Sequence, residues 1–388
     1  MHSRRRSVAV RERARFVALT LPIAALSALA LLGCGGSPGL GAAHASAAGA
    51  EVAPSDVGGP PPDHYDGSNA VAVHDRTAAS DTDSTRPAAS RGGRMPNQLG
   101  RIPVFEYHLL GAGESRWKVD TAHFRQTLQL LYDRGYRPIN IADMLDRKID
   151  IPAGTSPVVL VFDDASPSQF SYVERDGRLE IDPNSAVGML LDFSKRHPDW
   201  KKKAVFCVLP AAQSGHAFFG EKGIAGQKSE WRFKKLQFLA EQGFELCNHT
   251  LYHANLGKQT DERAQEFIAR GQMAIDSAVP GYRVRTFALP LGVWPKNRPL
   301  AWTGSWTEAR SGRAVRYSYD AVLEVAGGPA RSPFDPQFNP RSITRIEAFG
   351  QQVERTLDQL DRSGNRYVAD GKAFLASARG QQHPQQQR

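Results

Sequence analysis

The sequence predicts an α/β fold in which parallel strands alternate with amphipathic helices. Residues 158–162 and 204–209 are continuous apolar runs rich in β-branched side chains, which is typical of strands buried on both faces. Between such runs lie segments with apolar residues at helical spacing, for example Phe233, Leu236 and Leu239. The alternation predicts a parallel sheet covered by helices, and on its own it allows either an open sheet or a closed barrel.

The expected elements follow one another from residue 102 onward. A first strand is expected at residues 102–108, and Asp120 or Thr121 is expected to cap a helix that stops at Gly135. Further strands are expected at residues 158–162, 204–209, 244–247, 284–289 and 321–325. Further helices are expected to bury Phe233, Leu236, Leu239 and Ala240, then Ala264, Phe267, Ile268 and Ile275, and finally Val353, Leu357 and Leu360.

The first 33 residues have the pattern of an export signal. Arginines are followed by an apolar run at residues 16–32, which is short for a membrane span and is interrupted by Pro22. The Leu-Leu-Gly-Cys sequence at 31–34 resembles the lipobox of bacterial lipoproteins. It predicts a signal peptide at 1–33, lipidation of Cys34, and an exported lipoprotein anchored in the membrane of a bacterial cell envelope. An ordinary cleaved signal is the alternative.

The composition excludes several classes of protein. With 41% hydrophobic and 23% charged residues among 388, the chain is neither wholly disordered nor a multi-span membrane protein, and 3 cysteines are too few for a disulfide scaffold. Without residues 1–33, 43 basic and 39 acidic residues remain, so the net charge falls from +9 to +4. So mild an excess does not indicate a nucleic-acid partner, and no protein partner is expected.

One folded domain is expected, at residues 99–379. Residues 34–98 are mostly Ala, Gly, Ser, Pro and Asp, with Leu40 as their single leucine and no Ile, Phe or Trp. Such a segment buries too little apolar surface to offset its ordering entropy, so we expect a disordered linker. The Gln-rich tail at 380–388 is expected to be disordered for the same reason.

The residues best suited to catalysis or metal binding are two aspartates and two histidines. Asp163 and Asp164 end the apolar run at 158–162, where α/β folds place their sites. His249 and His253 are four residues apart, so on a helical turn both imidazoles would share one face and could bind one metal ion. A solvated Asp-Asp turn with two surface histidines explains the same residues.

At these positions the sequence resembles the polysaccharide deacetylases with a NodB-homology domain. The family's Thr-Phe-Asp-Asp motif appears as Val161-Phe162-Asp163-Asp164, and its His-Ser/Thr-x-x-His motif is matched in full at 249–253. A third motif, Pro-aromatic-Gly after a strand, is approximated at 287–292. With the Pro-Val-x-x-Tyr-His strand at 102–108, the resemblance extends over residues 102–350.

The resemblance implies a distorted (β/α) barrel of the NodB-homology, glycoside hydrolase/deacetylase type. It also implies a metal-dependent hydrolase of carbon–nitrogen bonds that removes N-acetyl groups from a polysaccharide containing N-acetylhexosamine. Asp163 would act as general base on a metal-activated water, and Asp164, His249 and His253 would be the metal ligands. One divalent cation is implied, with Zn²⁺ expected and Co²⁺, Ni²⁺ or Mn²⁺ as alternatives. The expected residues of the substrate pocket and its surroundings are Thr250, Pro290, Gly292, Trp294 and Arg345.

The sequence departs from the family where the proton donor is concerned. The family's Leu-x-His motif is missing, and Ala288 stands where a base-holding arginine is frequent. We therefore expect His108 to be the proton donor or its helper, with a structural histidine as the alternative. Arg285 and Arg345 are candidates to replace the arginine, although each also fits an ordinary surface or supporting role.

These departures keep other functions open. An O-acetyl esterase on a polysaccharide such as xylan needs less protonation of its leaving group than an amidase. A lipoprotein that binds glycan without hydrolysing it is a third possibility. Two further features stay ambiguous: Cys207 and Cys247 are favoured as buried thiols over a disulfide, and the tryptophans of the loop after residue 292 fit either sugar stacking or core packing.

Overall fold

The computed structural model describes residues 94–211 and 217–372. The expected signal peptide, Cys34, most of the expected linker and the tail at 380–388 lie outside these residues. Backbone pairing in the described domain begins at Asn97, which forms a β-bridge with Val368. Neither described segment contains a helix that is long and apolar enough to cross a lipid bilayer.

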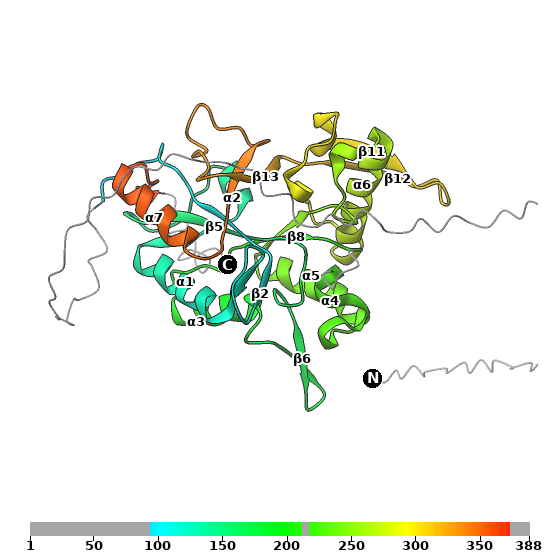
Figure 1. Cartoon of the computed structure of the whole chain (residues 1–388), viewed down its shortest axis with the longest axis horizontal. Coiled ribbons are helices and arrows are strands. Elements are labelled where there is room, and N and C mark those ends of the chain that lie inside the picture. The colour runs from blue at the N-terminus through cyan, green and yellow to red at the C-terminus, as the bar shows by residue number, and fades with distance from the viewer. Residues whose placement is uncertain (1–93, 212–216, 373–388) are drawn as a thin grey trace, which may run out of the picture. The chain divides into compact units, whose positions relative to one another are not determined.

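Seven parallel strands close into a barrel (Figure 1). In spatial order they are β1 (Val104–Tyr107), β14 (Ile343–Glu347), β13 (Ala321–Gly327), β10 (Thr286–Ala288), β9 (Glu245–Asn248), β8 (Val205–Val208) and β5 (Ser156–Phe162). The barrel closes because β1 pairs with both β14 and β5. A short strand, β4 (Tyr136–Pro138), adds to the other side of β5. The α/β barrel implied by the family resemblance is confirmed, and the open sheet is excluded.

Helices follow the barrel strands; the hydrophobic periodicity predicted those at residues 121–133, 232–241, 261–278 and 352–363 and did not predict those at 141–145 and 186–196. They are α1 (Thr121–Asp133), α2 (Ile141–Leu145), α3 (Ala186–Arg196), α5 (Arg232–Glu241), α6 (Asp261–Ala278) and α7 (Gln352–Ser363), with a short distorted turn, α4 (Ala217–Gly220). The predicted start of α1 is confirmed, since the Asp120 side chain accepts a hydrogen bond from the backbone N–H of Ala122. Arg134 is the C-cap, and Gly135 follows with a positive φ of 76°, which ends the helix as expected.

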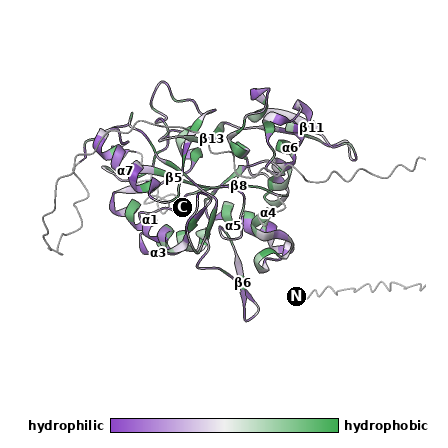
Figure 2. Cartoon of the chain, viewed as in Figure 1, coloured by the Kyte–Doolittle hydropathy of each residue, from purple (hydrophilic) through white to green (hydrophobic). Residues whose placement is uncertain are grey.

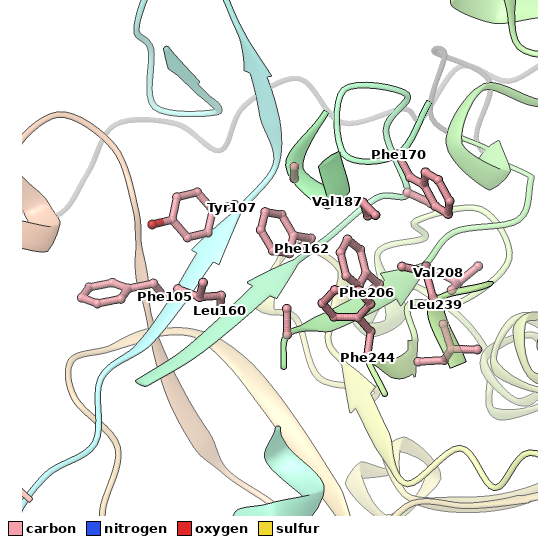
Figure 3. Close-up of a cluster of buried hydrophobic side chains, with 14 of the residues drawn as sticks. Phe105, Tyr107, Leu160, Phe162, Phe170, Val187, Phe206, Val208, Leu239 and Phe244 are labelled. Carbon is pink, nitrogen blue, oxygen red and sulfur yellow. The ribbon is translucent and has the colours of Figure 1, made fainter. Parts of the chain in front are cut away.

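Alternate residues of each strand face opposite sides of the barrel wall, which produces two hydrophobic cores. Phe105, Leu160, Phe162 and Phe206 belong to the cluster that packs against the helices (Figure 3). The residues between them, such as Val161, fill the barrel interior. Apolar residues concentrate on the strands and on the inner faces of the helices (Figure 2). Every residue of β5 is buried, which explains why its sequence shows no polar alternation.

Three two-stranded ribbons are added to the barrel, and the sequence did not predict them. They pair β2 (Leu109–Gly111) with β3 (Lys118–Asp120), β6 (Tyr172–Arg175) with β7 (Arg178–Ile181), and β11 (Thr303–Thr307) with β12 (Ala314–Ser318). The last ribbon corrects one expectation, because Trp306 lies in β11 and not in a loop. Its residues alternate between exposed and partly buried, a weaker pattern than that of the buried barrel strands.

Candidate active site

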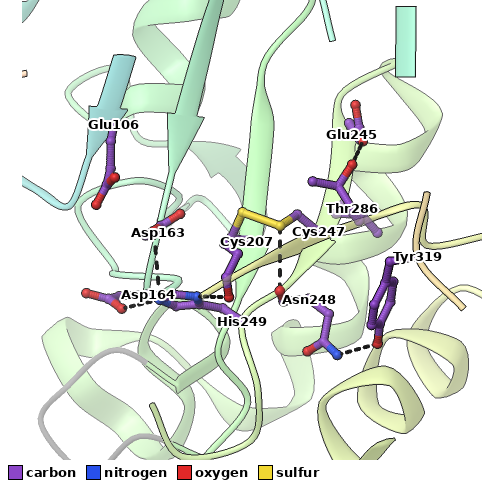
Figure 4. The surroundings of a disulfide bond; sticks show 12 residues. Glu106, Asp163, Asp164, Cys207, Glu245, Cys247, Asn248, His249, Thr286 and Tyr319 are labelled. Atoms are coloured by element: carbon purple, nitrogen blue, oxygen red, sulfur yellow. Dashed lines mark hydrogen bonds and ion pairs between the residues drawn. A yellow bond between two sulfur atoms is a disulfide. The ribbon is translucent and has the colours of Figure 1, made fainter. Parts of the chain in front are cut away.

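The ends of β5 and β9 bring the predicted aspartates and histidines together (Figure 4). His249 Nε2 lies 3.4 Å from Asp164 Oδ1 and 3.8 Å from Asp163 Oδ2. His253 Nε2 lies 3.7 Å from the same oxygen of Asp164. Four residues that span 91 positions of the sequence therefore form one cluster at the carboxyl ends of two parallel strands that are separated in the barrel only by β8.

The backbone around this cluster is strained. Asp164, Thr250 and His253 all have positive φ angles, of 77°, 66° and 56°. The left-handed region costs a residue other than glycine roughly 1–2 kcal/mol, and such costs concentrate at functional sites. The spacing of His249 and His253 suggested a helical turn, but the structure has none there. Instead, a loop with two left-handed residues brings the two ring centroids to 4.9 Å from each other.

Asp164, His249 and His253 fit a bound cation. Their ligand atoms all lie within 4.8 Å of one another. His249 Nδ1 is 3.0 Å from the carbonyl oxygen of Ala288 and donates to it, so Nε2 is the bare nitrogen that faces Asp164. Within the described chain, neither His249 Nε2 nor Asp164 Oδ1 has a hydrogen-bond partner, although both are buried. Two acceptors so close need a positive charge between them.

The electrostatics of the cluster lead to the same conclusion. Burial by itself would lower the pKa of His249, but Asp163 and Asp164 outweigh burial and raise it. Burial lowers the pKa of His253 to about 4, so this ring is neutral and able to bind a metal ion at neutral pH. Burial opposes the ionised form of Asp164, but the surrounding histidines hold its pKa well below the usual range. The site therefore keeps its carboxylate charged and attracts cations.

Asp163 has one anchored oxygen and one free oxygen. Its Oδ2 accepts a hydrogen bond of 2.8 Å from Nη1 of Arg345, whereas its buried Oδ1 has no partner among residues 94–211 and 217–372. Burial would raise the pKa of Asp163, but Arg345, His249 and His108 together lower it. Asp163 is therefore ionised, and Oδ1 is available to accept a proton.

Of the two arginines considered as substitutes for the one missing at Ala288, Arg345 is the one that contacts Asp163. It is fully buried in β14, and besides Asp163 it lies 2.9 Å, through Nε, from Oε2 of Glu106. Arg285 is not the replacement, because it pairs with Asp146 and Asp320. The sequence did not show which of the two arginines lies beside Asp163, because only closure of the barrel places β14 beside β1.

His108 and Glu106 extend the cluster on the β1 side. His108 directly follows β1, and its Nε2 lies 3.2 Å from Oε1 of Glu106. Glu106, His108 and Asp163 each offer an atom within 4.8 Å of the others, so His108 is close to Asp163. Burial lowers the pKa of His108. The sequence analysis missed Glu106, although a carboxylate in the middle of an apolar strand was a usable signal.

The other predicted pocket residues differ in their surroundings. Thr250 is fully buried and its backbone N–H donates to Asn248 Oδ1, but its hydroxyl makes no hydrogen bond to any described residue. Pro290 and Gly292 bracket a turn whose middle residue, Leu291, is 37% exposed. Gly292 has a φ of 64°, and a Cβ there would lie 3.0 Å from the side chain of Val325.

Trp294 packs against other side chains of the domain. It contacts Trp302 edge to face with ring centroids 6.4 Å apart, and both are partly buried against the outer core. The guanidinium of Arg298 lies 4.1 Å from the Trp294 ring, and that of Arg341 lies 4.6 Å from the Trp302 ring. These contacts favour the packing interpretation of the tryptophans.

Cys207 and Cys247 form a disulfide, which corrects the expectation of two thiols. The two residues are direct partners in the register of β8 and β9, and their Cα atoms are 4.2 Å apart. Both side chains belong to the cluster in the barrel interior, and the bond lies near His249 (Figure 4). The sequence showed that both residues lie in neighbouring strands, but the relative register of parallel strands is not visible in it.

The comparison with known families decides the class of this domain. Residues 151–301 match the family model of the polysaccharide deacetylases. The chain contains a polysaccharide deacetylase domain. The expectation of a hydrolase acting on carbon–nitrogen bonds is thereby confirmed. Polysaccharide deacetylases are generally metal-dependent, and Asp164, His249 and His253 are a possible metal site of this one.

Solved structures of deacetylases are similar to this polysaccharide deacetylase at low sequence identity. The deacetylase PplD of Streptococcus pyogenes, in complex with acetate, is 19% identical over 67% of this chain and 98% of its own, with a TM-score of 0.46. A Bacillus cereus polysaccharide deacetylase is 16% identical over 68% of this chain and 69% of its own, with a TM-score of 0.45. IcaB from Ammonifex degensii is also 16% identical, over 67% of this chain and 96% of its own, with a TM-score of 0.44. No curated protein matches the sequence significantly.

Proposed function

We propose that this polysaccharide deacetylase removes N-acetyl groups from a polysaccharide that contains N-acetylhexosamine, with Asp163 as the general base. The observation that carries the proposal is the state of Asp163. Arg345 anchors one carboxylate oxygen at 2.8 Å, while the other is buried and free, beside the cluster of Asp164, His249 and His253. An ionised carboxylate in this position can take a proton from a water molecule.

Asp164, His249 and His253 are the residues that would hold the metal ion. A site of two imidazoles and one carboxylate with an open position suits Zn²⁺, which we expect, and Co²⁺, Ni²⁺ and Mn²⁺ are the alternatives. A divalent cation supplies Lewis acidity here, which polarises the acetamide carbonyl and brings the pKa of water toward ~7. The hydrogen bond from His249 Nδ1 to Ala288 keeps Nε2 bare for this purpose.

The protein residues divide the proton transfers between them. Asp163 Oδ1 accepts a proton from the attacking water, and Arg345 keeps the carboxylate in place through Oδ2. The departing sugar amine must receive a proton, because an amide anion is too poor a leaving group. His108 is the proposed donor, since it lies near Asp163 and no other histidine of the described chain besides the metal-ligand candidates belongs to either cluster.

Acetate release from two substrates tests this function. The metal-loaded protein would be incubated with N-acetylglucosamine oligomers and with O-acetylated xylan, each with and without chelator. Chelator-sensitive release from the oligomers is the expected result. Release from xylan alone would replace the proposal by an O-acetyl esterase. Retained metal without hydrolysis of any acetylated glycan would instead support a glycan-binding protein.

We also propose that the enzyme is exported and anchored to the bacterial cell envelope through a lipid on Cys34. The support is the sequence pattern of residues 1–34. Mass spectrometry of the N-terminal peptide would show a lipid-modified Cys34 at the new N-terminus. The Cys34→Ser variant should then move from the detergent phase to the aqueous phase, and an unmodified cysteine in the wild type would contradict the proposal.

A further inference from the structure

We infer that Gln169 is a positioning residue for the proposed proton donor, His108. Its carboxamide ties the backbone of His108 to that of Asp163, and it thereby fixes where the imidazole lies relative to the proposed base. The inference rests on the proposed function and deepens it, because it concerns how the donor and the base of that reaction are kept together. Gln169 itself neither takes up nor gives a proton.

The two strands that lead to His108 and Asp163 separate just before these residues. β1 ends at Tyr107, whose carbonyl accepts a hydrogen bond of 2.9 Å from the Asp163 N–H. The N–H of Leu109 would continue a parallel ladder to the carbonyl of Asp163, but it donates to the carbonyl of Trp117 at 3.0 Å instead. The carbonyl groups of His108 and Asp163 therefore lie beyond the ladder and need other donors.

The side chain of Gln169 supplies these donors. Its Nε2 lies 2.6 Å from the carbonyl oxygen of His108 and 2.5 Å from that of Asp163, and the residue is completely buried. An amide nitrogen carries two hydrogens, so each carbonyl can receive one of them. Oε1 accepts no hydrogen bond from any described residue. The two N–H groups are therefore the polar contribution of this side chain, and they bridge the ends of β1 and β5.

The turn that carries Gln169 is held firmly in place. The Gln169 N–H donates to the carbonyl of Ser166 at 2.9 Å, and the Gln169 carbonyl accepts at 2.9 Å from the N–H of Val187 at the start of α3. The neighbouring side chain, Ser168 Oγ, accepts a hydrogen bond of 2.9 Å from the N–H of Leu110. One turn after β5 thus holds the chain that leaves β1 at two points.

The bridge matters more for His108 than for Asp163. The side chain of Asp163 has a second anchor, the hydrogen bond of 2.8 Å from Arg345. The ring of His108 packs edge to face on Trp117, with centroids 4.9 Å apart, but this contact does not fix its backbone. Loss of the Gln169 bridge should therefore displace His108 from a base that stays in place, and a displacement of about 1 Å can cost about 100-fold in rate.

The test replaces the carboxamide by a side chain of similar length. Gln169→Met removes both donors, and we expect kcat on an N-acetylglucosamine pentamer to fall by about 10- to 100-fold, with KM within about 2-fold. Hydrolysis of 4-nitrophenyl acetate should change by less than about 3-fold, because its phenolate leaves without a proton. Equal losses on both substrates would show a merely structural role and overturn the inference.

A double-mutant cycle shows whether Gln169 acts through His108. In the His108→Ala background the imidazole is absent, so adding Gln169→Met should change pentamer hydrolysis by less than about 2-fold. A double variant whose loss equals the product of the two single losses would show that the residues act independently. That result would also overturn the inference.

Gln227→Met is the matched control. Gln227 is another buried carboxamide that bonds a backbone, with Oε1 at 2.8 Å from the N–H of Tyr172 and Nε2 at 3.0 Å from the carbonyl of the same residue. The control should leave kcat and the ratio of amide to ester hydrolysis unchanged. A loss of kcat equal to that of Gln169→Met would show that any broken carboxamide bridge has this effect, which contradicts the inference.

A second variant keeps the test decisive if Gln169→Met does not fold. Gln169→Asn retains the carboxamide one methylene further back, and it should show a smaller loss restricted to the amide. A wild type without pentamer hydrolysis would refute the proposed function itself. An active wild type whose ratio of amide to ester hydrolysis is unchanged in both Gln169 variants would refute only this inference.

Discussion

Arg345 Nη1 donates a hydrogen bond of 2.8 Å to Asp163 Oδ2, across 182 residues of sequence. The arginine lies on β14 and the aspartate follows β5, and β1 stands between these two strands in the barrel. Neither side chain exceeds 1% exposure. This contact therefore ties Asp163, the proposed general base, to the strand that closes the barrel, and the same arginine also reaches Glu106 on the strand in between.

Removing the guanidinium of Arg345 should destabilise the fold as well as the site. In Arg345→Met two buried carboxylates lose their counter-ion, and we expect the free energy of unfolding to fall by about 3–5 kcal/mol in urea titrations at pH 7. Arg285→Met is the control. Arg285 also pairs with two aspartates, Asp146 and Asp320, but all three are partly exposed, so about 1 kcal/mol or less is expected. Equal losses in both variants would contradict the role assigned to burial.

Asp163→Asn should abolish turnover without releasing metal. Asparagine keeps the shape of the side chain but cannot accept the proton of water, so kcat should fall by about 10²- to 10⁴-fold. Metal content, measured by elemental analysis after gel filtration, should match that of the wild type. Asp164→Asn is the informative partner, because it should lose the metal. Activity of Asp163→Asn within tenfold of the wild type would show that another group is the base.

His123 should make stability depend on pH. Burial alone would lower its pKa, but Glu114 at 2.7 Å and Glu354 at 3.3 Å raise it. A histidine whose pKa is higher in the folded state stabilises fully below its unfolded pKa of ~6.5 and stops doing so as pH rises through the folded value. His123→Gln should therefore cost up to about 1 kcal/mol at pH 5.5 and little at pH 8.5. Denaturant titrations at both values would check this, and a pH-independent loss would contradict it.

The disulfide should contribute substantially to stability. It closes a loop of 40 residues, for which chain-entropy arguments give about 2–4 kcal/mol. The double variant Cys207→Ala/Cys247→Ala should lose this amount in urea titrations. Peptide mass mapping without reductant should find the two cysteines in one linked peptide pair. Two separate thiol peptides from the folded protein would contradict the bond.

The local part of the site could be predicted from the sequence. Asp163 and His249 each follow an apolar run, so their place at strand ends needed no tertiary information. The spacing of His249 and His253 allowed a shared metal ion, and the resemblance to the polysaccharide deacetylases implied the full ligand set with Asp164. The conformation between His249 and His253 could not be predicted, because left-handed residues at 250 and 253 replace the helical turn that the spacing suggested.

The long-range part could not be predicted, and the physical reason is register. Whether Arg345 or Arg285 reaches Asp163 depends on which residues of β14 and β10 face the barrel interior at the height of the site. That height is set by the register between strands, which a single sequence does not show. The same limit concealed the bond between Cys207 and Cys247. Glu106 could not be assigned for a different reason: the apolar neighbours that predict its strand do not show which groups surround its side chain.

Closure of the barrel also has a consequence for the timing of activity during synthesis. Glu106 and His108 come from the first barrel strand to be made, and Arg345 comes from the last. Until β14 is complete and inserted beside β1, Asp163 lacks its anchor and the buried carboxylates lack their counter-ion. A nascent or C-terminally shortened chain can therefore contain every metal-ligand candidate while Asp163, the proposed base, still lacks its anchor. Catalytic competence arrives as one of the last events in the making of the molecule.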